Sequence, residues 1–145
     1  MEKHPPLSFI LEYLVRDVLD FQRSEEGAQL RSLMSPLGFM KEFCTVRLGT
    51  RRRAGHSTAI INCLSTLSGS VVAVPLLAQK RWYMEHGVRE RDIFLIDGKT
   101  GLKNAAFGIV FVDCSNYVPQ KAKDAISDEI ADCGVVTGSC LAFVE

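Results

Sequence analysis

FCTVRLGTRRRAGHSTAIINCLSTL, residues 43–67, holds the order of elements on which the fold of this chain depends. Its first seven residues, 43–49, are rich in strand-forming types, and a short loop bounded by glycines follows them. Beyond the second glycine, apolar residues recur at the spacing of a helix that starts near residue 56. A strand, a glycine-rich loop and a helix N-terminus in this order provide the free backbone N–H groups that can bind phosphate.

The rest of the chain continues this alternation of strands and helices. Apolar runs predict further strands over 70–78, 92–97, 107–113 and 139–145, and helical patterns occupy 79–87 and 119–134. Nearly continuous apolar strands are typical of a parallel sheet that is buried on both faces. The sequence therefore predicts one α/β domain over residues 1–145, a mostly parallel sheet with helices on both faces.

Residues 7–34 predict a helical segment ahead of the first strand. Ser8, after two prolines, is the expected N-cap, and residues 25–27 are expected to divide the segment into two helices. The sequence of residues 35–38 is expected to end it. An amphipathic helix ordinarily packs its apolar stripe against its own domain, so we expect an N-terminal extension packed on the body. A partner or oligomer interface is the alternative.

Charge and cysteine content limit the classes of protein to consider. The 145 residues carry 17 Lys and Arg against 17 Asp and Glu, so any nucleic-acid contact must come from a local patch. The N-terminal region has no uninterrupted apolar stretch of membrane-span or signal length. Five widely spaced cysteines without a CxxC pair predict reduced thiols. We expect a cytoplasmic protein that does not associate with membranes.

The loop of residues 49–58 is the candidate phosphate site. The common phosphate-binding pattern is G-x-x-x-x-G-K-[ST], in which the lysine contacts phosphate and the hydroxyl binds Mg²⁺. Gly55 matches the second glycine and Ser57 the hydroxyl, whereas His56 occupies the lysine position and Thr50 the first glycine position. The candidate phosphate-contacting residues are Gly49, Thr50, Arg51, Arg52, Arg53, Ala54, Gly55, His56, Ser57 and Thr58. The plainer interpretation is a turn in which Ser57 or Thr58 caps the helix.

A second element strengthens the phosphate-site interpretation. The apolar strand 107–113 ends in Asp113, and P-loop proteins use an aspartate in that position to hold Mg²⁺ through water. With these features, residues 43–115 resemble the P-loop NTPases, in a divergent form seen in phage and other viral proteins and similar to their helicase- and terminase-like subset. Gly101, ahead of this strand, fits that subset. Asp97 is the rival for the aspartate role.

The resemblance implies a function. It implies ATP as the nucleotide, Mg²⁺ held by Ser57 and Asp113, and work on DNA or RNA as an oligomer in which a neighbour supplies an arginine. For a viral protein the compartment would be the host cytoplasm. The N-K-x-D guanine motif is absent from the sequence, which favours adenine.

Two departures from the family pattern predict slow hydrolysis or none. His56 supplies at most part of a lysine's charge, and Cys114 follows Asp113 where the subset has a glutamate that polarises the attacking water. We take Asp113 and His56 as the candidate catalytic residues. The alternatives are a regulatory module without turnover, or a nucleic-acid-binding protein that uses Arg51, Arg52 and Arg53 on backbone phosphate.

Two other segments are given structural roles. Residues 98–100 spell GKT, but their glycine forms an Asp-Gly pair with residue 97, which predicts a polar turn from which Lys99 could still face a ligand. Lys80, Arg81 and Trp82 form a small basic-aromatic group, and we expect Trp82 and Tyr83 to serve in helix packing.

Overall fold

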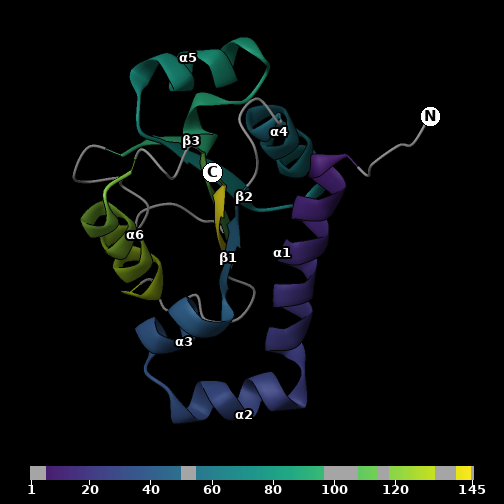
Figure 1. Ribbon diagram of the computed structural model, residues 1–145, viewed down its shortest axis with the longest axis vertical. Helices are drawn as coiled ribbons and strands as arrows, with labels where there is room; N and C mark the ends of the chain where they lie inside the picture. The colour runs from purple at the N-terminus through teal and green to yellow at the C-terminus, as the bar shows by residue number, and fades with distance from the viewer. Residues whose placement is uncertain (1–5, 50–54, 97–107, 114–117, 133–139, 145) are drawn as a thin grey trace.

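The computed structural model describes residues 6–49, 55–96, 108–113, 118–132 and 140–144. Six helices, five strands and one 3₁₀ turn are assigned within these ranges. In chain order (Figure 1) they are α1 (Leu7–Arg23), α2 (Glu25–Leu33), α3 (Pro36–Phe43), β1 (Thr45–Leu48), α4 (His56–Thr66), β2 (Ser70–Val74), α5 (Leu77–Glu85), η1 (Glu90–Asp92), β3 (Ile93–Leu95), β4 (Ile109–Asp113), α6 (Gln120–Asp132) and β5 (Cys140–Val144).

The five strands form one sheet in the order β1-β5-β4-β2-β3, and every pairing in it is parallel. Strands β4 and β5 lie side by side in the interior of the sheet, and all their residues are buried. The predicted α/β class with a parallel sheet is confirmed. Parallel neighbours cannot be joined by tight turns, so strands that follow one another in the chain require crossover connections.

Alternate residues of the central strands face two separate hydrophobic cores. Ile109 and Phe111 of β4 belong to the core shared with α1, α4 and α5. Val110 and Val112 belong to the core shared with α3 and α6. Figure 1 shows the same division, with α1 and α4 on one side of the sheet and α3 and α6 on the other. Helices therefore cover both faces, as the sequence predicts.

The N-terminal segment is two helices that meet at Ser24. Its Oγ accepts a 3.1 Å hydrogen bond from the N–H of Gly27. A Cβ at Gly27 would lie 2.1 Å from the carbonyl oxygen of Phe21, so only glycine fits this corner. The predicted division at 25–27 is thus confirmed to within a residue. The Ser8 N-cap is wrong, since α1 begins at Leu7 directly after Pro6.

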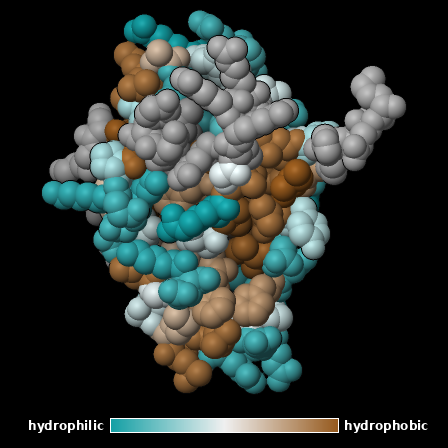
Figure 2. All heavy atoms as spheres, viewed as in Figure 1, coloured by the Kyte–Doolittle hydropathy of each residue, from teal (hydrophilic) through white to brown (hydrophobic). Residues whose placement is uncertain are grey.

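Helix α1 contacts the body of the molecule. Leu11 and Val15 are fully buried in the core shared with α4. Phe9 and Tyr13, on another part of the same helix, remain about two-thirds exposed at 67% and 70%. Figure 2 shows hydrophobic residues on the surface in the region of α1, whereas hydrophilic residues prevail over α6.

Two elements differ from the prediction. The helical segment ends ahead of residues 35–38 as predicted, since α2 ends at Leu33, but these residues also begin α3, a helix that the sequence did not predict. Ser35 Oγ accepts the N–H of Gly38 at 3.0 Å, and Pro36 suits a first helical position. The strand predicted over 70–78 ends at Val74, and α5 begins at Leu77. Apolar runs do not separate a buried strand from the start of a helix.

Candidate functional site

At the carboxyl end of β4, the connections that leave neighbouring strands pass to opposite faces of the sheet. The helices that follow β1 and β2 pack on one face of the sheet, whereas α6, which follows β4, packs on the other. Because β2 and β4 are neighbours, their carboxyl ends form a topological switch point. Ligands of open α/β sheets bind outside the carboxyl ends of the strands at such a point.

Helix α4 starts at this edge of the sheet with a left-handed residue. Gly55 has φ +86° and ψ 35°, a conformation that glycine adopts without strain. No side chain caps this helix start among the described residues. The hydroxyl of Ser57 donates a hydrogen bond to Asp113 and does not accept one from the start of α4. Ser57 is therefore not a plain N-cap. The N–H groups of the first turn lack intrahelical acceptors, as in any α-helix.

Asp113, the last residue of β4, links this strand to α4 and α5 through hydrogen bonds. Its Oδ2 accepts a 2.6 Å hydrogen bond from Ser57 Oγ on α4 and a second, also 2.6 Å, from the hydroxyl of Tyr83 on α5. Asp113 and Tyr83 are both fully buried. Odd-numbered residues of β4 face the core shared with α4 and α5, and Asp113 continues this alternation. Buried hydrogen bonds of this kind hold a carboxyl group in a single orientation.

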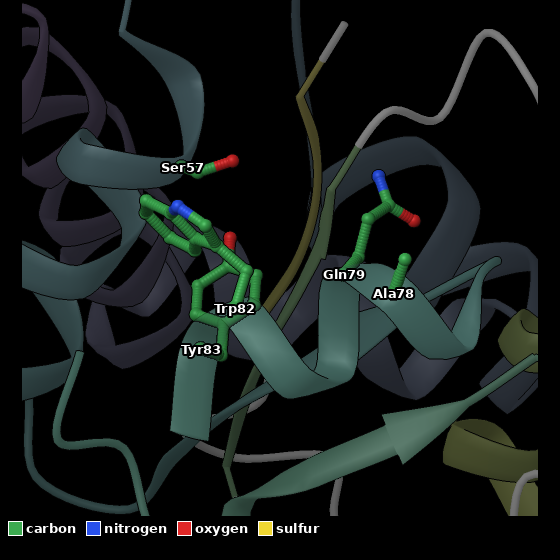
Figure 3. A pocket seen from close by; sticks show the side chains of 5 residues that line it. All are labelled: Ser57, Ala78, Gln79, Trp82 and Tyr83. Carbon is green, nitrogen blue, oxygen red and sulfur yellow. The ribbon is translucent and has the colours of Figure 1, made fainter. Parts of the chain in front are cut away.

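A pocket of about 300 Å³ lies between α4 and α5 beside this hydrogen-bonded group. Its described lining residues are Ser57, Ala78, Gln79, Trp82 and Tyr83, four of which come from α5 (Figure 3). The ring of Trp82 stacks on His86 at 4.0 Å and meets the ring of Tyr83 edge-on at 5.1 Å. The volume falls at the lower end of the range for small-molecule sites.

The remaining predicted site residues are distributed as follows. Gly49 is exposed directly after β1, His56 is the first residue of α4 and half-buried, and Thr58 is exposed on the same helix. Outside the described residues lie Thr50, Arg51, Arg52, Arg53, Ala54, Asp97, residues 98–100, Gly101 and Cys114. Of the predicted pairs, the structure brings together Ser57 and Asp113.

Tyr83 belongs to the candidate site, although its sequence context predicts only a role in helix packing. It is buried as expected, but its hydroxyl bonds to a carboxyl group 30 positions further along the chain. No spacing rule connects two such positions. The available signal was general: a tyrosine buried in a helix needs a partner for its hydroxyl.

The donor set of this group fits a hard cation. A serine hydroxyl and an aspartate carboxylate are oxygen ligands, which Mg²⁺ prefers, and Mg²⁺ ordinarily takes only one or two carboxylates and fills its other positions with water and phosphate oxygens. Among the residues that the structure describes, no cluster of three or more His, Cys, Asp or Glu side chains offers another centre.

Three cysteines are free and buried, namely Cys44, Cys63 and Cys140. Burial raises the pKa of the Cys44 and Cys63 thiols to about 11 and that of Cys140 to about 12. Thiols are weak nucleophiles and metal ligands until they lose their proton. These three side chains therefore act as small hydrophobic groups in the core.

Within the described ranges, no helix has both the length and the apolar character needed to cross a bilayer. No protein-family model, no curated protein and no solved structure matches this chain.

Proposed function

We propose that this chain is a P-loop-like protein that binds ATP with Mg²⁺ at the carboxyl edge of its sheet and hydrolyses it slowly. The observation that carries the proposal is the 2.6 Å hydrogen bond between Ser57 and Asp113. These residues lie 56 positions apart and occupy the two positions for which the P-loop resemblance implies a shared metal ion. A helix cap or a solvated turn would not require this contact.

Each residue then has a separate task. Gly55 gives the chain the left-handed turn that starts α4, and the first-turn N–H groups face the phosphates. Ser57 and Asp113 hold the metal, Asp113 through water, while Tyr83 fixes the orientation of the Asp113 carboxyl group. The metal, when bound, neutralises charge on the β- and γ-phosphate oxygens.

Turnover is slow in this proposal because two groups are missing. Phosphoryl transfer depends almost entirely on positioning and charge stabilisation. His56 replaces the lysine that would contact the terminal phosphates, and no glutamate follows Asp113 to orient the attacking water. The same two absences support the alternative of a nucleotide-binding regulatory module that does not turn over.

Binding of labelled ATP with and without Mg²⁺ tests the proposal. Ser57→Ala should weaken Mg²⁺-dependent binding much more than metal-free binding, because the lost hydroxyl is a metal ligand. Ser65→Ala is the matched control, since Ser65 is exposed on the same helix and, among the described residues, its hydroxyl bonds only to the carbonyl of Asn62. Equal loss for Ser57→Ala in both conditions, or no ATP binding by the wild-type chain, would contradict the proposal.

A further inference from the structure

The α5 wall of the pocket carries side-chain N–H donors. None of the described lining residues is charged, and Gln79 and Trp82, one helical turn apart, each bring side-chain N–H groups. Tyr83, from the same wall, donates its hydroxyl proton to Asp113. Neutral donors without carboxylates suit an anionic or acceptor-rich ligand better than a cation.

The amide of Gln79 is held in one orientation. Its Oε1 accepts a 3.1 Å hydrogen bond from the backbone N–H of Leu76 at the start of α5. Because the amide is planar, its Nε2 then points away from that N–H. Figure 3 shows Nε2 directed away from the α5 ribbon, with Ser57 of α4 on the other side of the pocket. Among the described residues, Nε2 has no acceptor.

We propose that Gln79 Nε2 donates a hydrogen bond to the terminal phosphate of the bound nucleotide, so that α5 distinguishes a triphosphate from a diphosphate. This inference rests on the proposed function. A metal ion held by Ser57 would neutralise charge on the terminal phosphates, so the end of the phosphate chain would lie nearest the pocket beside Ser57. At about 30 Å³ per water, a volume of about 300 Å³ accommodates a phosphoryl group with several waters.

Gln79→Glu is the decisive variant because it separates the two roles of this side chain. Glutamate keeps an oxygen that accepts the N–H of Leu76, but it replaces the donor amide by a second carboxylate oxygen. Gln79→Ala removes both groups. Gln29→Glu, at an exposed position on α2, adds the same charge far from the pocket and serves as the control.

The measurements are the affinities for Mg²⁺-ATP and Mg²⁺-ADP and the thermal stability of each variant. Gln79→Glu should keep wild-type stability and lose about tenfold or more in ATP affinity, with a much smaller loss for ADP. Gln79→Ala should lose stability through the missing cap and less ATP affinity than Gln79→Glu. Gln29→Glu should match the wild type in both measurements.

Two results overturn the inference while leaving the proposed function intact. One is an equal loss of ATP and ADP affinity in Gln79→Glu. The other is wild-type ATP affinity in Gln79→Glu with reduced stability in Gln79→Ala, which would make the side chain a helix cap only. A wild-type chain that binds neither nucleotide overturns the proposed function and this inference with it.

Discussion

The hydroxyl of Tyr83 and the carboxyl group of Asp113 are joined by a 2.6 Å hydrogen bond in which both side chains are fully buried. This bond fastens α5 to the end of β4, two elements that are not consecutive in the chain. The same carboxyl oxygen also accepts the Ser57 hydroxyl, so any movement of Asp113 is transmitted to both α4 and α5.

Replacing Tyr83 by phenylalanine tests the contribution of this bond. Tyr83→Phe keeps the ring in the core but leaves the buried carboxyl group with one donor fewer, so the free energy of unfolding should fall by about 1–3 kcal/mol. Urea denaturation measures the change. Tyr13→Phe is the control because Tyr13 is 70% exposed on α1, and it should leave stability unchanged. Equal stability of the two variants would show that the bond contributes nothing.

The left-handed start of α4 makes a separate prediction. Gly55→Ala should cost about 1–2 kcal/mol, because an L-residue is strained at φ +86°. Among the described residues, a Cβ there would meet no atom within 4 Å, so the expected cost comes from strain. Gly49→Ala is the control, since Gly49 lacks a positive φ and a Cβ there also meets none of the described atoms within 4 Å. If denaturant midpoints shift equally in both variants, the backbone conformation of Gly55 is not the reason.

His56→Lys should tighten binding of Mg²⁺-ATP, because lysine is the residue that contacts phosphate at this position of the common phosphate-binding pattern. Isothermal titration calorimetry of the wild type and the Lys variant measures the change. An unchanged affinity in the Lys variant would remove His56 from the phosphate site.

The three arginines of the loop separate nucleotide from nucleic-acid binding. If the loop holds a nucleotide, Arg51→Ala, Arg52→Ala and Arg53→Ala should weaken ATP binding unequally, since one side chain reaches the phosphates and the others stay solvated. If the loop holds DNA or RNA, the three variants should weaken binding of a short single strand about equally. Each variant should then reduce the log–log salt slope by about one unit. Fluorescence titrations at two salt concentrations measure both outcomes.

The buried thiols predict a loss of stability at alkaline pH. Burial raises the pKa of the Cys63 thiol to about 11, with a smaller contribution from the charge of Glu12. The pKa of a cysteine in an unfolded chain is about 8.5. The unfolded chain therefore loses this proton first, and stability should fall as pH rises from about 9 through about 11. Denaturation at a series of pH values measures the trend. Cys63→Ala should make the trend less steep without abolishing it, because Cys44 and Cys140 remain and their pKa values are raised in the same way. The lower stability of the variant is taken as its own reference.

The same burial protects the thiols from reagents at lower pH. Around pH 8, alkylation of Cys44, Cys63 and Cys140 in the folded chain should be far slower than in concentrated guanidinium. Peptide mapping by mass spectrometry assigns the modification to each position. Alkylation of Cys140 at the rate of an unfolded thiol would contradict its full burial.

Much of the fold is already specified by local patterns along the chain. Strand and helix periodicities are repeated over five to thirteen residues, and β4, β5 and α6 lie where these patterns indicate. Signals that depend on a few residues carry less information: residues 35–38 end the preceding helical segment as predicted but also start α3, since serine and proline suit both a turn and a helix N-terminus.

Local patterns along the chain suffice for the α/β class, the mostly parallel sheet and the two residues, Ser57 and Asp113, that suggest a nucleotide site. The strand order follows from the packed fold, and so does the position of the end of β4 beside α4 and α5. Strand order depends on crossover connections and on the packing of two cores, which no local pattern encodes. The hydrogen bond between Tyr83 and Asp113, and the position of Gln79 in the pocket beside Ser57, follow from this strand order.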